Sequence, residues 1–175
     1  MHVEAAHKAY FPSHKAISVF GGGFVSSKLN TVFNNTITPG TATLLPATWY
    51  HVAMVRNNSV LYGYVNGVQD STFSTSAAAG VSGAACRILT DQVAAVTFNG
   101  YVSNLRIVNN VAVYTGPFTP PTAPLSAIPG TVLLTCQSNR FNDFSTLNNT
   151  ITVVGAPQVQ KLSPFATVTM PTYYS

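Results

Sequence analysis

Two adjoining segments with strand-like alternation constrain the fold more than any other feature of this sequence. The segment 49–56, WYHVAMVR, is largely apolar on both faces of a strand, and 60–66, VLYGYVN, follows it after Asn57-Asn58. The dipeptide Asn66-Gly67 then matches a type I′ hairpin turn, in which both central residues need positive φ. Because a strand that is apolar on both faces must be covered on both sides, we predict that 49–56 lies centrally in an antiparallel sheet.

Further segments of the same kind make this an all-β prediction. Turn residues separate them, and no stretch shows the 3.6-residue period of a long helix. Residues 34–40 are predicted as a turn and 74–85 as a surface loop. The proline-rich stretch 117–129 is predicted to wrap across the outside of the sandwich, because proline cannot donate to a strand ladder. The other predicted strands are 16–20, 24–33 (one or two strands), 86–90, 93–98, 100–108, 132–136 and, at a sheet edge, 151–154.

Composition narrows the class of protein further. The length of 175 residues suits one domain spanning 1–175, and only 7% of the residues are charged, against roughly 25% in an average protein. The net charge is +4, but no two basic residues are adjacent, whereas a nucleic-acid groove needs clustered cations. No run approaches the ~20 apolar residues of a membrane span. We therefore expect neither nucleic-acid binding nor membrane insertion.

The two cysteines leave two states open. Cys86 and Cys136 both lie in apolar runs, which favours buried free thiols. A disulfide between them would require close Cα atoms and an oxidising compartment. Neither cysteine belongs to a CxxC motif, so a zinc site is not predicted.

Three stretches resemble one known family. Residues 49–68 are similar to the central hairpin of laminin G-like, concanavalin A-like domains. Residues 98–125, which include FNGYVSNLRIV, and 133–165, which include LLTCQSNRF, resemble later parts of one branch of that family. That branch is common in tail, fibre and other virion proteins of marine and cyanobacterial phages. The resemblance implies a concanavalin A-like jelly roll, an antiparallel β-sandwich with little helix.

The N-terminal part departs from the family pattern. The family usually opens with strands of the types F-x-G-x-x-D-Y-L and F-T-I-E-x-W, and neither occurs before residue 48. We therefore expect residues 1–47 to be shortened or diverged, and residues 166–175 to form a tail. A sandwich that lacks an edge strand exposes unpaired backbone groups, so we expect a neighbouring subunit to cover that edge.

The carboxylates argue against catalysis. The same jelly roll houses glycoside hydrolases, which need two carboxylates about 5 to 9 Å apart. This chain offers only Glu4, Asp70, Asp91 and Asp143, and no two share a short motif. We predict that the protein is not an enzyme and has no catalytic residues. His51 is interpreted as a packed, hydrogen-bonded strand histidine.

Calcium is the one metal that the resemblance implies, since laminin G-like domains often bind it through Asp, Asn and backbone oxygens. Asn139, Asn142 and Asp143 form an oxygen-rich cluster. The alternative, which the composition of the cluster favours, is a turn with Asx hydrogen bonds. No other cofactor is predicted.

Aromatic residues outside the core strands are candidates for contacts with a glycan or with another subunit. Arg106 and Arg140 lie in family-like segments, SNLRIV and CQSNRF, where each is expected to tie loop carbonyls together. The aromatic candidates are Tyr10, Phe11, Tyr114, Phe118, Tyr173 and Tyr174.

A structural module of a phage virion is the function that the resemblance implies: a capsid decoration, tail or fibre component. It would be assembled in the host cytoplasm and act outside the cell, and the chain shows no secretion signal at its start. Its partners would be other virion proteins or copies of itself in a homo-oligomer, with a cell-surface glycan as a further contact. The alternative is a carbohydrate-binding adhesin or lectin that recognises a host-surface polysaccharide.

Overall fold

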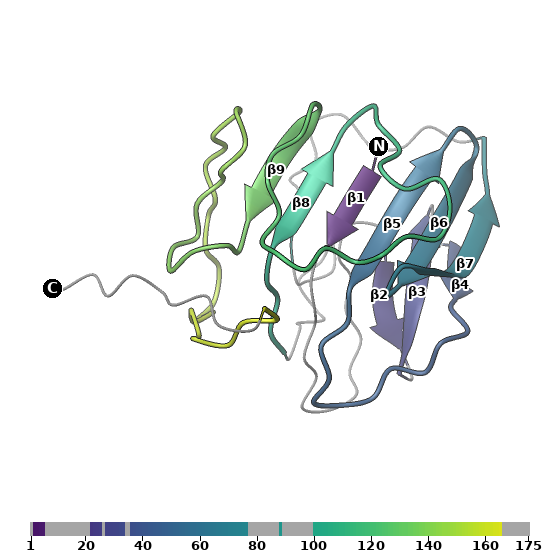
Figure 1. Ribbon diagram of the computed structural model, residues 1–175, viewed down its shortest axis with the longest axis horizontal. Coiled ribbons are helices and arrows are strands. Elements are labelled where there is room, and N and C mark those ends of the chain that lie inside the picture. The colour runs from purple at the N-terminus through teal and green to yellow at the C-terminus, as the bar shows by residue number, and fades with distance from the viewer. Residues whose placement is uncertain are drawn as a thin grey trace, which may run out of the picture.

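Six strands form one antiparallel sheet in the order β7-β6-β5-β1-β8-β9 (Figure 1). The computed structural model describes residues 2–5, 22–25, 27–33, 36–76, 88 and 100–165. None of these residues forms a helix long and apolar enough to span a bilayer. The strands of this sheet are β1 (His2–Ala5), β5 (Val52–Asn57), β6 (Val60–Val65), β7 (Val68–Ser74), β8 (Leu105–Val108) and β9 (Thr131–Thr135).

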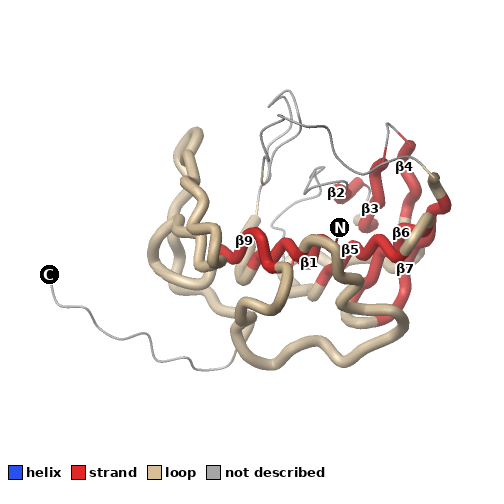
Figure 2. The backbone as a smooth tube through the Cα atoms, turned by 90° about the horizontal axis from the view of Figure 1, so that it is seen from above, coloured by secondary structure: helices blue, strands red, loops and turns tan. Residues whose placement is uncertain are grey.

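A second antiparallel sheet packs on one end of the first. It consists of β2 (Gly22–Val25), β3 (Lys28–Phe33) and β4 (Thr36–Pro39), and it lies over β6 and β7 (Figure 2). Gly63 of β6 permits the close approach: a Cβ there would lie 2.4 Å from the Ser71 Oγ and 3.0 Å from the Thr31 Oγ1. The hydroxyls of Thr31 and Ser71 are 2.8 Å apart and hydrogen bond across the two sheets.

The proline-rich segment covers the opposite face of the six-stranded sheet, as predicted (Figures 1 and 2). The Phe118 N–H donates to the Gly67 carbonyl at 3.0 Å, which fixes the segment to the β6–β7 turn. Further along, the Arg106 Nη1 donates to the Ser126 carbonyl at 2.8 Å, so this arginine ties a loop carbonyl as expected. Between these anchors, Leu125 packs against Leu134 of β9.

The central hairpin is confirmed. β5 lies between β6 and β1, and the Ala53 and Val55 side chains are fully buried. Asn66 and Gly67 have φ values of 49° and 81°, as a type I′ turn requires. The segment 24–33 takes part in two strands, β2 and β3, which pair as a hairpin.

Three predicted elements differ from the structure in type or in extent. The predicted turn at 34–40 contains β4, with proline at the end of the strand, where a missing N–H is tolerated. The predicted strand 100–108 shortens to β8, because Asn104 has φ 57° and its Oδ1 accepts from the Leu125 N–H at 2.9 Å. Residues 151–154 form no strand in the described part of the chain. The predicted strands 16–20 and 93–98, and 86–90 apart from Ile88, lie outside the described residues.

Candidate functional site

Asp70 of β7 holds the chain that follows β4. Its Oδ1 accepts hydrogen bonds from the Ala42 N–H at 2.6 Å and from the Thr41 N–H and hydroxyl at 2.9 and 3.1 Å. Gly40 lies so close that a Cβ there would come within 1.7 Å of the Asp70 Oδ2. The carboxylate is buried and joins β7 to the chain after β4 through its Oδ1, while its Oδ2 has no hydrogen-bond partner among the described residues.

Asp143, in the loop after β9, is the second buried carboxylate. Burial alone would raise the pKa of Asp143, but its hydrogen bonds outweigh that effect and lower the pKa from 3.8 to about 2. The donors are the backbone N–H groups of Leu134, Ser145 and Asn149, the Ser145 hydroxyl and the Asn149 side-chain amide, at 2.7 to 3.0 Å.

The loop that Asp143 organises covers the outer edge of β9. The Leu134 N–H donates to the Asp143 Oδ1 at 3.0 Å, and the Leu134 carbonyl accepts from the Phe144 N–H at 2.7 Å. The Val132 carbonyl accepts from the Asn149 Nδ2 at 2.8 Å. Three backbone groups that a neighbouring strand would use, one at Val132 and two at Leu134, are therefore partnered by side chains and loop backbone.

The three residues of the predicted calcium cluster play different parts. The Ser145 N–H bond to the Asp143 Oδ1, at 2.8 Å, is the Asx hydrogen bond of the alternative interpretation. Asn139 and Asn142 are exposed. The described residues contain no group of three or more His, Cys, Asp or Glu side chains that could hold a metal ion. Calcium binding at this cluster stays a prediction.

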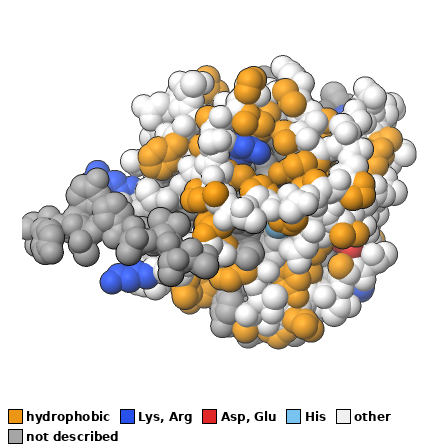
Figure 3. All heavy atoms as spheres, viewed as in Figure 1, with side chains coloured by type: hydrophobic (Ala, Val, Ile, Leu, Met, Phe, Trp, Pro, Cys, Tyr) orange, Lys and Arg blue, Asp and Glu red, His pale blue; other side chains and the backbone are white. Residues whose placement is uncertain are grey.

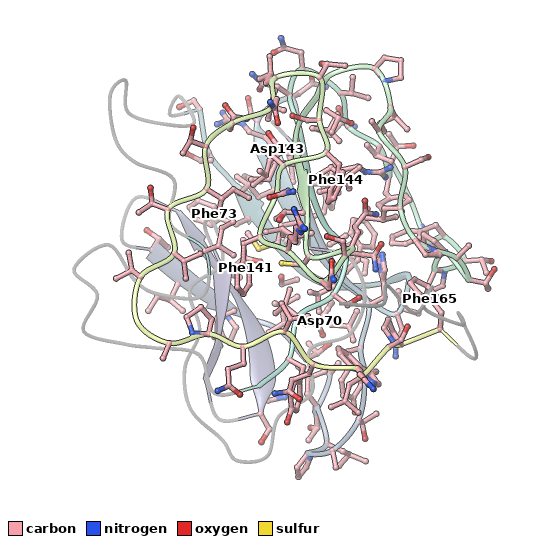
Figure 4. All side chains as sticks on the ribbon, turned by 90° about the vertical axis from the view of Figure 1, so that its left-hand side faces the viewer. Asp70, Phe73, Phe141, Asp143, Phe144 and Phe165 are labelled. Atoms are coloured by element: carbon pink, nitrogen blue, oxygen red, sulfur yellow. The ribbon has the colours of Figure 1, made fainter. Side chains whose placement is uncertain are left out.

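The two buried carboxylates are far from each other. Asp70 lies on β7 and Asp143 beside β9, at opposite edges of the six-stranded sheet, and Figure 4 shows them on separate elements. Five strand spacings of about 4.8 Å separate these edges, on the order of 24 Å. A glycosidase pair needs about 5 to 9.5 Å. Asp91 and the Glu4 side chain lie outside the described part of the chain.

Two of the predicted aromatic contact residues meet on the covered face. The Tyr114 and Phe118 rings are stacked, with centroids 3.4 Å apart and planes 4° apart. Phe118 meets the fully buried rings of Tyr64 and His51 edge-on, at 5.5 and 5.3 Å. Burial, with a smaller contribution from nearby Tyr62, raises the pKa of Tyr64. The packing of His51 is therefore as expected, whereas its place in the chain is not, because it lies just before β5.

The remaining residues singled out in the sequence are four aromatic residues and the two cysteines. Tyr10, Phe11, Tyr173 and Tyr174 lie outside the described residues. Cys136 is a free thiol, and Cys86 lies outside the described residues. Burial raises the pKa of Cys136, while a hydrogen bond with the Thr135 side chain opposes the rise. Sequence reasoning did not predict that Asp70 holds the chain after β4 or that Asn149 binds the Val132 carbonyl, because only the fold brings these partners together.

Apolar side chains are spread over the surface of the molecule. Figure 3 shows them across the face that the proline-rich segment covers, with few charged side chains between them. A second set belongs to the C-terminal part of the described chain. Its exposed members are Phe144, Leu147, Val153, Val154, Val159 and Leu162.

Comparison with known families agrees with this architecture. A family model described as the concanavalin A-like lectin/glucanases superfamily matches residues 13–113, which is more than half of the chain. The match includes residues 13–47, the part that we expected to depart from the family, and ends before residues 133–165. Comparisons with curated proteins and with solved structures gave no significant match. The match and the antiparallel β-architecture together show that this chain belongs to the concanavalin A-like lectin/glucanases superfamily.

Proposed function

We propose that the protein is a non-enzymatic structural module of a phage virion: a capsid decoration, tail or fibre component. The superfamily fold supports a binding or structural role, and residues 98–125 and 133–165 resemble a phage branch of that superfamily. Its partners would be other virion proteins or further copies of the chain.

The positions of the buried carboxylates carry the non-enzymatic part of the proposal. Asp70 and Asp143 are engaged in holding loops, and they stand at opposite edges of the sheet. Neither is within reach of the other for acid and base roles on one glycosidic bond. The hydrogen bonds that the Asp143 carboxylate accepts lower its pKa to about 2, so it stays ionised and is a poor proton donor.

The exposed apolar side chains support the structural part. Val154 is 83% exposed and Leu162 is 53% exposed. No charged residue occurs from Phe144 through Gln160. Apolar, uncharged surface of this kind is typical of protein–protein contacts.

The proposal is tested on purified particles. We expect mass spectrometry of gradient-purified virions to detect the chain in stoichiometric amounts with other virion proteins, and we expect the recombinant chain to release no reducing ends from polysaccharides. The chain's absence from particles would contradict the structural role, and turnover of a polysaccharide would contradict the non-enzymatic one.

Carbohydrate binding is a second candidate, favoured by the superfamily and by the half-buried Tyr114–Phe118 pair, because sugar rings stack on aromatic faces. A glycan array would reveal a ligand for the wild-type chain. Tyr114→Ala should then weaken binding, whereas Val111→Ala, on an exposed residue of the same segment, should not. If both variants bind as the wild type does, the pair is not the site.

A further inference from the structure

Residues 151–154, Ile-Thr-Val-Val, have the composition of a strand but no strand partner. We propose that this segment pairs with the same segment of a second copy of this chain, as an antiparallel strand pair with two-fold symmetry. The inference rests on the proposed function and names the partner for one surface of the module.

The segment is packed at its N-terminal end and exposed to solvent at its C-terminal end. Ile151 packs against the cluster of Leu105, Ile107 and Leu133, so it fixes the segment to the sandwich. Val153 and Val154 are 46% and 83% exposed. β-branched residues are enriched in strands, where their side chains pack on a pleated surface.

The backbone of the segment is equally open. Among the described residues, none hydrogen bonds to the main chain of residues 150–154. Gly155, which follows with φ 79°, has no other group within 4 Å of where its Cβ would lie. The space beside Gly155 is therefore open, and the backbone donors and acceptors of the segment remain available to another chain.

The neighbouring edge of the chain's own sheet cannot supply the partner. The outer side of β9 is already occupied by Asp143, Phe144 and Asn149. The other edge of this sheet, β7, lies at the far end of the sheet order. The segment is thus close to the β9 edge, which is already occupied, and distant from the β7 edge. This placement favours pairing between molecules.

The uncharged composition favours a second copy as the partner. From Phe144 through Gln160 there is no charge, so two copies of the segment can meet without repulsion and a charged partner gains nothing. In a two-fold pair centred on Thr152, each Thr152 faces its counterpart and Ile151 faces Val153. Thr–Thr and β-branched pairs are favourable across antiparallel strands.

A charge-swap experiment on the full chain tests the pairing by sedimentation equilibrium. We expect the wild-type chain to form dimers through this segment. Thr152→Lys and Thr152→Glu each place like charges opposite each other and should weaken dimerisation on the order of tenfold. An equimolar mixture of the two variants should restore it. Val159→Lys, an exposed residue outside the pair, should dimerise as the wild type does.

Three outcomes would overturn the inference: a wild-type chain that stays monomeric, a Thr152→Lys variant that dimerises normally, or a mixture that does not recover. Thermal melts of each variant check that the fold is intact. A monomeric wild-type chain that is nevertheless found in virions would refute this pairing and leave the proposed function standing. Absence of the chain from particles would refute the function instead.

Discussion

The Asp143 carboxylate accepts the Leu134 N–H at 3.0 Å and so takes the place of a neighbouring strand at the outer edge of β9. The Phe144 N–H likewise takes the place of a strand donor, because it donates to the Leu134 carbonyl. A strand edge with free backbone groups invites pairing with other chains. By closing this edge, the loop confines such pairing to other parts of the surface.

Removing the carboxylate should destabilise the fold. Asp143→Ala leaves the buried Leu134 N–H without its acceptor and frees the loop through Asn149, so we expect the free energy of unfolding to fall by about 2–4 kcal/mol. Urea denaturation measures the change. Asn142→Ala, on the exposed neighbour, should shift it by less than about 0.5 kcal/mol. Equal effects of the two changes would contradict the anchoring role.

Stability should also depend on pH through Asp143. Its pKa is about 2 in the folded protein and 3.8 in the reference state, so the unfolded chain binds more protons between these values. The stabilisation is complete above about pH 5 and is lost as the pH falls toward 2; we expect about 1–2 kcal/mol after allowance for solvent screening. The check is the stability of Asp143→Asn against pH, which should be flatter than that of the wild type. Parallel curves would contradict the assignment.

Two glycines with nearly equal positive φ values should respond differently to alanine. Gly67 and Gly155 have φ values of 81° and 79°, but a Cβ on Gly67 would lie 1.7 Å from the Phe118 carbonyl oxygen, whereas Gly155 is in open space. Gly155→Ala should cost about 1 kcal/mol of backbone strain, and Gly67→Ala about 3 kcal/mol or more. Chemical denaturation of both variants compares them. Similar costs would show that the proline-rich segment does not pack on the turn.

The hydroxyl pair between the sheets can be measured by a double-mutant cycle. Thr31→Val and Ser71→Ala each remove one partner of the buried hydrogen bond, and we expect a coupling energy of about 1 kcal/mol. As a control, Ser74→Ala changes an exposed residue of β7. The stability losses of Ser74→Ala and Thr31→Val should add up in the double variant. A coupling near zero between Thr31 and Ser71 would mean that this contact does not join the sheets.

Local chemistry explains which elements were predictable. The type I′ turn at Asn66-Gly67 and the strands beside it follow from residues that are neighbours in sequence, and the structure has them. The strand at 100–108 was predicted too long, because alternation alone does not show that Asn104 leaves the ladder to bind Leu125 and Gln137. Residues 151–154 were predicted as an edge strand because of their β-branched composition, which does not show whether a partner strand lies beside them.

The roles of the two buried carboxylates depended on distant contacts. Nothing next to Asp70 in the sequence indicates that it receives the backbone of Thr41 and Ala42, which are 28 or 29 residues away. The oxygen-rich composition around Asp143 was visible, but its acceptance of the Leu134 N–H requires β9 to be an edge strand in the described sheet.

The sequence by itself therefore determined the all-β class, the central hairpin, the wrapping proline-rich segment and the resemblance to the superfamily. Each of these depends on side-chain alternation, turn chemistry or proline geometry over a few residues. The tertiary structure alone decided which edge is closed, which carboxylates are occupied and which apolar segment is left exposed. Those properties depend on which distant backbone groups meet, and hydrogen bonds between distant residues leave no local pattern in the chain.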